Sequence, residues 1–394
     1  MVMKGFVYLL EISIALILMI AVIGTISSFK SKENWERSDL IGLGDNMMRV
    51  LDNKDFSEIL KGNLTKISSI KPPNIDFGIK ISGIPKDNIT VGCIQPFCGY
   101  VNLLFTPTYL NNRWVNFSVE EATGDPEWIM SYFDAVALVN NTTYSDPYIK
   151  EYLKRGKTII GINATYSNNN ADFNGIFGLT PTSSGGGNFN FTTYNPLEDE
   201  TQKYFFAIGF DINTSNTIDS KKWGNWYIWG IPRKVNITSN MVDVENKTSD
   251  EGFLRNIPEG GFFNIKNTTD NKFYTFKVKK IFWDKFVIIQ PMNISFAFND
   301  FSDANDVIGK FNIITSSTGQ AEMTSNNTAI WISDFPPSEE YKTLIKAAVL
   351  SRVKEWYIKE PDLTKEYVAV SSFYSLCCDI PETAQMTLYL WYKI

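Results

Sequence analysis

The sequence predicts one apolar helix near the N-terminus, followed by a protein of the α/β class. Residues 6–26 carry a single charge, that of Glu11, and about 20 apolar residues are enough for a helix to cross a bilayer. Residues 133–179 alternate short apolar strands with helical segments, which is typical of a parallel sheet with helical crossovers. We therefore expect a transmembrane helix at 6–29 and an α/β domain at 125–394.

The apolar run is too long for a secretory signal, whose apolar region spans about 7–15 residues and ends in small residues of the A-x-A type. No such site follows residue 26. The helix should therefore stay with the protein. We expect a single-pass protein of the cell membrane with most of its chain outside the cell.

A basic residue, a small residue and then the apolar helix form the sequence Lys4-Gly5-Phe6-Val7. This junction resembles the class III signal of archaeal type IV pilin-like proteins, in which a membrane peptidase cuts after the glycine. The resemblance implies cleavage between Gly5 and Phe6, a leader at 1–5, and other pilin-like subunits as partners. An uncleaved signal anchor, with Lys4 held inside by the positive-inside bias, is the alternative.

The position of Glu11 departs from the pilin pattern, because pilins usually carry glutamate at the fifth mature position and Glu11 would be the sixth. A carboxylate inside the bilayer is costly unless it is paired. In a pilin-like assembly its partner would be the free N-terminus of a neighbouring chain. Otherwise Glu11 lies close enough to the interface to stay hydrated.

Composition narrows the classes of function. The net charge is -6 and no basic stripe appears, which argues against nucleic acid as a partner. The chain has no histidine, so the commonest general base and the commonest zinc ligand are both missing. We expect neither an enzyme nor a bound cofactor.

Asparagine is frequently followed by serine or threonine two positions later. Such sequons accept N-glycans on extracellular surfaces, and they are more numerous than composition alone predicts; biased composition is the other explanation. We predict glycosylation at Asn63, Asn88, Asn116, Asn140, Asn141, Asn163, Asn190, Asn213, Asn236, Asn246, Asn267, Asn293 and Asn326.

Four cysteines in an exported chain favour disulfides. A bond between Cys93 and Cys98 would close a short loop that contains Pro96. Cys377 and Cys378 would then form a strained vicinal bond, whereas cross-pairing would tie this loop to the C-terminal strands. A metal site made of all four thiolates is a weaker alternative, because adjacent cysteines lack the spacing of zinc knuckles.

The segments before the α/β domain read as a helical connector at 30–73 and a β-rich segment at 74–124. Apolar residues recur at near-helical spacing over 34–64, and Pro72-Pro73 ends the pattern. Alternation of apolar and polar residues over 74–120 predicts short antiparallel strands.

The α/β domain is predicted from strands at 133–140 and 157–163, each followed by a helix, at 145–156 and 170–179. This order makes a βαβ unit. A β-rich insertion of irregular pattern occupies about 180–310.

Inside the insertion, one stretch is strand-like, KKIFWDKFVIIQP at 279–291. After the insertion, regular helices and strands are expected again. A strand is expected at 329–335 and a helix at 338–357. The last 28 residues read as two strands, 367–373 and 386–394, around a turn.

Four features of this region carry a second resemblance: FDAVALVN (133–140), the helix ending in Lys154-Arg155-Gly156, KTIIGIN (157–163) and the pair Phe177-Gly178. Together with 329–357 they resemble the class I glutamine amidotransferase-like fold, a flavodoxin-like sheet. In that family the nucleophilic cysteine follows the strand that matches 157–162. Here Asn163 holds that degenerate nucleophile position and no histidine exists, so the resemblance implies a catalytically dead scaffold.

Three other groups of residues could form a site or serve a simple structural role. Asp172 or Asp334 could serve a carboxylate hydrolase, although such residues at strand ends are more often caps. An aromatic group could stack on sugar rings or fill a small core: Trp223, Trp226, Tyr227 and Trp229. An oxygen-rich turn could hold Ca²⁺, but its spacing departs from the known loop pattern: Asp300, Ser302, Asp303, Asn305 and Asp306.

The sequence therefore predicts a membrane-anchored, glycosylated cell-surface protein of pilin-like type, with a structural or adhesive role and no catalysis. The alternatives are an extracellular sugar- or peptide-binding protein on a signal anchor, with carbohydrate as a partner, and a surface hydrolase. No metal site is expected.

Overall fold

The fold was analysed in a computed structural model. The residues that it describes are 38–123, 129, 131–139, 151–162, 175–181, 188–192, 200–213, 235–238, 241–245, 253–266, 273–282, 286–292, 297–299, 307–309, 312–316, 321–326, 328–332, 339–376 and 378–393. The apolar segment 6–26, with the predicted processing site and Glu11, lies outside them. In the part that is described, no helix is long and apolar enough to cross a membrane.

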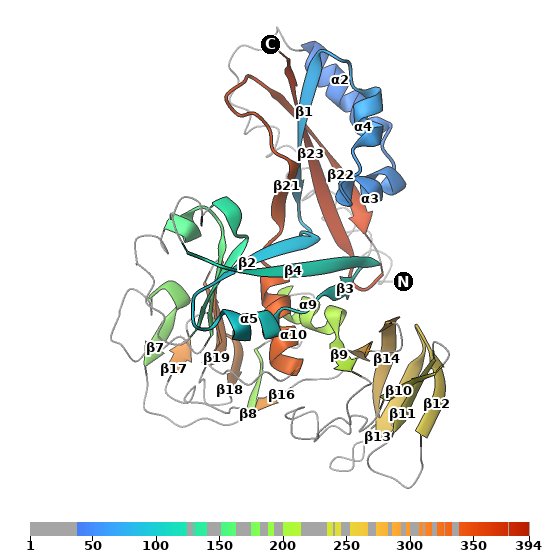
Figure 1. The fold of residues 1–394 in the computed structure, drawn as a ribbon, viewed down its shortest axis with the longest axis vertical. Helices are drawn as coiled ribbons and strands as arrows, with labels where there is room; N and C mark the ends of the chain where they lie inside the picture. Colours follow the sequence, from blue (N-terminus) through green and yellow to red (C-terminus); the bar gives the residue numbers. More distant parts are fainter. Residues whose placement is uncertain are drawn as a thin grey trace, which may run out of the picture.

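A large mixed sheet forms the centre of the molecule (Figure 1), and five of its described strands are parallel. In chain order these strands are β2 (Asn88–Cys93), β4 (Arg113–Glu121), β5 (Ala135–Val139), β6 (Thr158–Ile162) and β20 (Ala329–Ile332). In space they lie in the order second, first, third, fourth, fifth. The predicted α/β class is confirmed, and so is the parallel pairing of 133–140 with 157–163.

The middle strands are uniformly apolar because both of their faces are covered. Every residue of β5 and of β6 is buried, which explains why their sequences read as continuous apolar runs rather than alternating ones. Ile159, Ile160 and Ile162 are at most 2% exposed. These two strands lie in the middle of the large sheet.

The prediction of antiparallel strands throughout 74–124 is confirmed for residues 75–82 and 108–110, but it is wrong for β2, which pairs in parallel, and for residues 98–104, which form a helix. β1 (Ile75–Ser82) belongs to a different sheet, whereas β2 and β4 pair in parallel. The short helix α5 (Cys98–Leu104) carries the chain between them, and β3 (Thr108–Leu110) pairs antiparallel with β4. Alternation predicts a strand but not its direction, and seven residues are too few to show a helical period.

A second, antiparallel sheet joins the two ends of the described chain. Its strand order is β21 (Glu355–Lys359), β1, β23 (Glu382–Tyr392) and β22 (Val368–Leu376). The two predicted C-terminal strands are thus confirmed as the hairpin β22–β23. Residues 355–357, predicted as the end of a helix, instead form part of β21, because α10 (Glu339–Leu350) stops earlier.

Three helices cover one face of this sheet (Figure 1). They are α2 (Ser38–Arg49), α3 (Asn53–Leu60) and α4 (Thr65–Ile70). Asp52 and Asp55 form a capping box at the start of α3, which separates α3 from α2. The single helical stretch predicted over 34–64 is therefore a set of short helices.

The long insertion adds helix α9 and most of the remaining strands. The predicted single strand at 279–291 is a hairpin of β14 and β15. The bounds are α9 (Glu200–Ile208), β7 (Leu179–Pro181), β8 (Asn188–Phe191), β9 (Phe210–Asn213), β10 (Val235–Thr238), β11 (Met241–Glu245), β12 (Phe253–Pro258), β13 (Phe262–Lys266), β14 (Phe273–Phe282), β15 (Phe286–Met292), β16 (Ala297–Asn299), β17 (Val307–Gly309), β18 (Asn312–Ser316) and β19 (Ala321–Asn326).

The elements are strung along the long axis of the molecule. Figure 1 shows α2 and the antiparallel sheet at one end, the large sheet in the middle, and β10–β13 at the opposite end. The described part of the chain therefore begins near one end and places β10–β13 at the other.

Candidate functional site

The turn between β3 and β4 places two asparagines at the centre of the molecule. Leu110 pairs with Arg113, so the loop consists of Asn111 and Asn112 alone, and both have positive φ, 47° and 61°. A two-residue hairpin loop with positive φ at both positions is a type I′ turn, and asparagine is among the residues that tolerate it.

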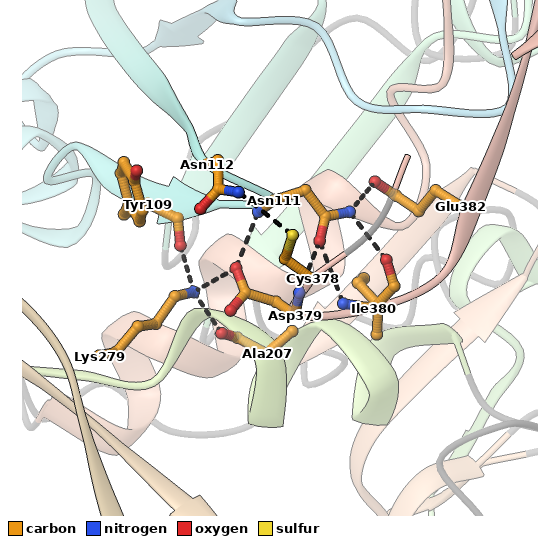
Figure 2. Close-up of polar contacts among 9 residues, drawn as sticks. All are labelled: Tyr109, Asn111, Asn112, Ala207, Lys279, Cys378, Asp379, Ile380 and Glu382. Carbon is orange, nitrogen blue, oxygen red and sulfur yellow. Dashed lines mark hydrogen bonds and ion pairs between the residues drawn. The ribbon is translucent and has the colours of Figure 1, made fainter. Parts of the chain in front are cut away.

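Asn111 is 7% exposed, and its side chain uses its full hydrogen-bonding capacity (Figure 2). Its amide nitrogen donates to Ile380 O at 2.9 Å and to Glu382 Oε2 at 2.7 Å. Its amide oxygen accepts from the backbone nitrogens of Asp379 and Ile380, at 2.9 and 3.1 Å. The Asn111 backbone nitrogen donates to Asp379 Oδ2 at 2.7 Å. One side chain thus fixes the turn that leads into β23.

Lys279 enters the same region from the insertion. The register of β14 against β15 shifts between Val278 and Lys280, so Lys279 is the extra residue of a β-bulge, which can redirect a side chain. Its side chain is 2% exposed and its Nζ lies 3.1 Å from Asp379 Oδ2. The ammonium also donates to the carbonyls of Tyr109 and Ala207.

A buried tyrosine and a buried glutamate complete the set. The Tyr204 hydroxyl donates to Glu382 Oε1, whose residue is 5% exposed. We call Asn111, Tyr204, Lys279, Asp379 and Glu382 the polar junction. It joins the large sheet, α9, the insertion and the antiparallel sheet at one point.

Burial sets the protonation behaviour of the polar junction. It lowers the pKa of Lys279 to about 8, although the charge of Asp379 opposes the shift. Burial, followed by the neighbouring negative charge of Glu382, raises the pKa of Tyr204. The phenol therefore stays protonated and continues to donate to the glutamate.

A second buried ion pair lies beside the polar junction. Lys346 of α10 is 1% exposed in its side chain, and its Nζ lies 3.2 Å from Asp211 Oδ2 and 3.0 Å from Thr106 Oγ1. A third ion pair joins Lys354, which follows α10, to Glu200 of α9. Burial lowers the pKa of Lys354 to about 8. Each pair links the insertion to an element outside it.

The arrangement is suited to holding segments together rather than to reacting with a ligand. The three donors of Lys279 meet three acceptors, and the amide of Asn111 is fully bonded. Removing one partner from such a buried set leaves the others without compensation, which is strongly destabilising. Over the described ranges, no group of three or more His, Cys, Asp or Glu side chains is placed to hold a metal ion.

Most of the sites predicted from sequence lie outside the described residues. This applies to Gly5, Phe6, Glu11, Asn163, Asp172, Asp334, the aromatic group at 223–229 and the oxygen-rich turn at 300–306. The structure neither brings these residues together nor separates them.

Three predicted glycosylation sites can be located with their side chains, Asn63, Asn88 and Asn116, and all three are exposed. Asn88 and Asn116 are register partners on β2 and β4, and Asn116 Nδ2 lies 3.2 Å from Asn88 Oδ1. Asn190, Asn213, Asn236 and Asn326 lie in strands whose backbone alone is described. The remaining sequons fall outside: Asn140, Asn141, Asn163, Asn246, Asn267 and Asn293.

The local disulfide is confirmed. Cys93 and Cys98 are bonded, with their Cα atoms 5.2 Å apart, so the bond closes the loop between β2 and α5. Cys377 lies outside the described residues. Cys378 is exposed, and its Sγ lies 3.1 Å from Asn112 Nδ2.

Sequence reasoning missed the polar junction. The pair Asn111-Asn112 between two alternating segments is a hairpin signal that could have located its turn. Lys279 had no comparable signal, because a bulge breaks the alternation that assigns side chains to faces. Asp379 and Glu382 reach the site only through the fold.

Comparison with protein-family models, with curated proteins and with solved structures gave no match.

Proposed function

We propose that this chain is a membrane-anchored, glycosylated cell-surface protein of pilin-like type, with a structural or adhesive role and no catalytic one. The observation that carries the proposal is the order of elements along the long axis (Figure 1). α2 is the first described helix after the apolar segment 6–26, and β10–β13 lie at the opposite end of the molecule. With the apolar segment in the bilayer, α2 would be the described helix nearest to the membrane along the chain.

The strand order of the parallel sheet supports a flavodoxin-like, amidotransferase-like fold for the central part. An order of second, first, third, fourth, fifth is that of flavodoxin-like sheets, whose ligands bind beyond the carboxyl ends of the strands. Asn163 directly follows β6 at this end. The asparagine at position 163 and the lack of histidine in the sequence support a non-catalytic scaffold without the thiol chemistry of that family.

The polar junction supports a mechanical role. It fastens the insertion and the antiparallel sheet to the large sheet by buried charges and saturated hydrogen bonds. A surface protein that transmits force between an anchor and a distal segment benefits from connections that cannot open one contact at a time. Sugar- or peptide-binding on a signal anchor remains the alternative function.

The adhesive form of the proposal is favoured by two exposed aromatics at the far end. Phe262 is 60% exposed and Phe273 is 68% exposed. Their register partners, Lys277 and Lys266, place both phenylalanines on the same face of the β13–β14 pair. Exposed rings on one face of a strand pair can stack on sugar rings or contact another protein.

The processing site provides the test. In a host that processes class III signals, we expect the mature chain to begin at Phe6 by intact-mass and N-terminal analysis. Gly5→Leu should block the cut because the peptidase requires a small residue there. Gly24→Leu, the same substitution within the apolar run, should leave the cut unchanged. Recovery of intact Met1 or of a start beyond residue 26 would contradict the pilin-like assignment.

A further inference from the structure

The strand β22 forms one edge of the antiparallel sheet. Over the described part of the chain, β23 is the only strand paired with it. In an antiparallel pair, alternate residues direct their N–H and C=O groups away from the partner. The outer edge of β22 therefore presents a row of backbone donors and acceptors over nine residues, Val368 to Leu376.

In its own sequence and its described pairing, this strand lacks the features by which soluble proteins prevent edge strands from pairing with other chains. Such edges are usually short, or carry charges, proline or a bulge. The sequence VAVSSFYSL contains no charge, no proline and no glycine, and its pairing with β23 has no register shift. Phe373 is 56% exposed on it.

The other sheet edges show the contrast. β21, the opposite edge of the same sheet, has five residues, carries Glu355 and Lys359, and is followed closely by Pro361. The outer strands of the other sheets, β3, β7, β9, β10, β12, β13, β16 and β17, have three to six residues. Among the sheet edges that the structure describes, that of β22 is thus an exception.

We propose that β22 pairs antiparallel with β22 of a second copy of this chain, around a two-fold axis at Ser372. A register that pairs all nine residues centres on this residue. It places Ser371 opposite Phe373 of the other copy, and Val370 opposite Tyr374. Like faces then meet: Val370 and Tyr374 lie on the side of the helices, and Ser371 and Phe373 lie on the other.

Self-pairing suits this sequence better than pairing with a different strand. Because β22 is uncharged, no like charges meet when it is paired with itself. The two copies of Phe373 come within diagonal reach of each other across the axis. The same patch serves both copies, as in isologous dimers, and the product is one continuous sheet of both molecules.

The association should be weak in dilute solution, because one strand pair buries less than the roughly 1,200 Å² of stable interfaces. Confinement of the copies at a surface would favour it through effective concentration. The inference does not depend on the membrane anchor, since it rests on residues of the described fold alone.

Disulfide trapping tests the pairing and its register. Full-length chain is prepared in detergent in two forms, one with Ser371→Cys and one with Phe373→Cys, which are mixed under mild oxidation. We expect a dimer linked between positions 371 and 373, identified by peptide mass analysis, in several-fold greater yield than from a mixture of Thr383→Cys and Gln385→Cys. These control positions lie on the same face of β23, one strand away from the edge.

A charge placed on the edge provides the second measurement. Ser375→Lys, added to both cysteine forms, should remove most of the 371–373 dimer, because edge lysines oppose strand addition. Leu363→Lys, in the exposed turn before β22, should not. If the 371–373 link forms no more than the control link, or survives Ser375→Lys undiminished while circular dichroism shows intact folding, the proposal is wrong. Association through the apolar segment would not select the 371–373 link, so failure here leaves the anchor proposal standing.

Discussion

Asn111 combines two roles at one position, a left-handed backbone and a saturated side chain. Few residues tolerate the backbone, and among them asparagine also offers two donors and an acceptor with two lone pairs. The neighbouring Asn112 shares the positive φ but is exposed. Comparison of the two positions therefore distinguishes the free-energy cost of the left-handed backbone from the contribution of the side-chain hydrogen bonds.

Asn111→Ala should lower the free energy of unfolding by about 3 kcal/mol more than Asn112→Ala, as measured by urea denaturation. Both variants place alanine at positive φ, so the roughly 1 kcal/mol of backbone strain is common to both. Only Asn111→Ala leaves the Glu382 carboxylate and two backbone nitrogens of 379–380 without this partner inside the protein. Equal losses from the two variants would show that the side-chain bonds contribute little.

Lys279 should make stability depend on pH above neutrality. Its pKa is about 8 in the folded chain against an ordinary value of 10.5, so between these values the unfolded state binds more protons. The free energy of unfolding should therefore rise with pH across this window, by up to about 3 kcal/mol from this residue.

Lys279→Met should remove that part of the slope. The comparison is made by urea denaturation of wild type and variant at pH 7.5, 9 and 10.5. Some slope should persist in the variant, because burial also lowers the pKa of Lys354 to about 8. Identical slopes in the two proteins would mean that Lys279 is not buried as an ammonium.

At the scale of elements, the contact between α2 and β22 depends on a glycine. A Cβ at Gly44 would lie 2.6 Å from Val370 Cγ2 and 3.3 Å from its Cβ, whereas a Cβ at Gly42 would meet nothing within 4 Å. Valine in a strand has few rotamers with which to move aside. Gly44 thus allows the close approach of α2 to β22, whereas a side chain at position 42 would meet no neighbouring atom.

Gly42→Ala should raise the free energy of unfolding by up to about 1 kcal/mol, the propensity difference between alanine and glycine in a helix. Gly44→Ala should lower it by about 1–2 kcal/mol, because α2 must move away from β22 and loses contacts. Thermal unfolding of the two variants in parallel provides the measurement. Stabilisation by both would show that the helix adjusts without loss.

Element types were predicted better than element partners. The strands at 133–140, 157–163 and in the C-terminal hairpin were found because their apolar patterns are strong and local. The direction of β2 relative to β4 was wrong, and 355–357 was assigned to a helix, because direction and pairing depend on residues far away in the chain. β21 exists as a strand because β1, more than 270 residues earlier, offers an edge to it.

At the scale of the whole molecule, the chain builds one connected body from segments that are distant in sequence. The antiparallel sheet takes strands from both ends of the described chain. The polar junction then connects that sheet to α9 through Tyr204 and to β14 through Lys279 (Figure 2).

The full-length protein should release no ammonia from glutamine above the rate of a buffer control. The reason is that, in the proposed amidotransferase-like fold, Asn163 would occupy the position of that family's nucleophilic cysteine, and the chain has no histidine to serve as a base. The assay includes Asn163→Ala as a matched variant. Glutamine hydrolysis by the wild type that disappears in Asn163→Ala would overturn the assignment of a dead scaffold.

The sequence alone determined the features that depend on local pattern. These are the long apolar segment, the α/β class and the positions of the sequons; the short spacing of Cys93 and Cys98 allowed a bond between them, but the structure decided among the possible pairings. Each is set by neighbours a few residues apart, through side-chain periodicity, turn chemistry or the reach of a short loop.

The tertiary structure decided what depends on non-local pairing. It placed β2 and β4 in parallel, left β22 at an uncharged edge, and buried Lys279 beside Asp379 and Asn111. From the local sequence, a charged residue within an apolar strand is expected at the surface. Lys279 is buried because a bulge directs it inward and because Asp379, 100 residues later, compensates its charge. The free energy of such an interaction depends on two groups that are far apart in the chain, so no short stretch of sequence predicts it.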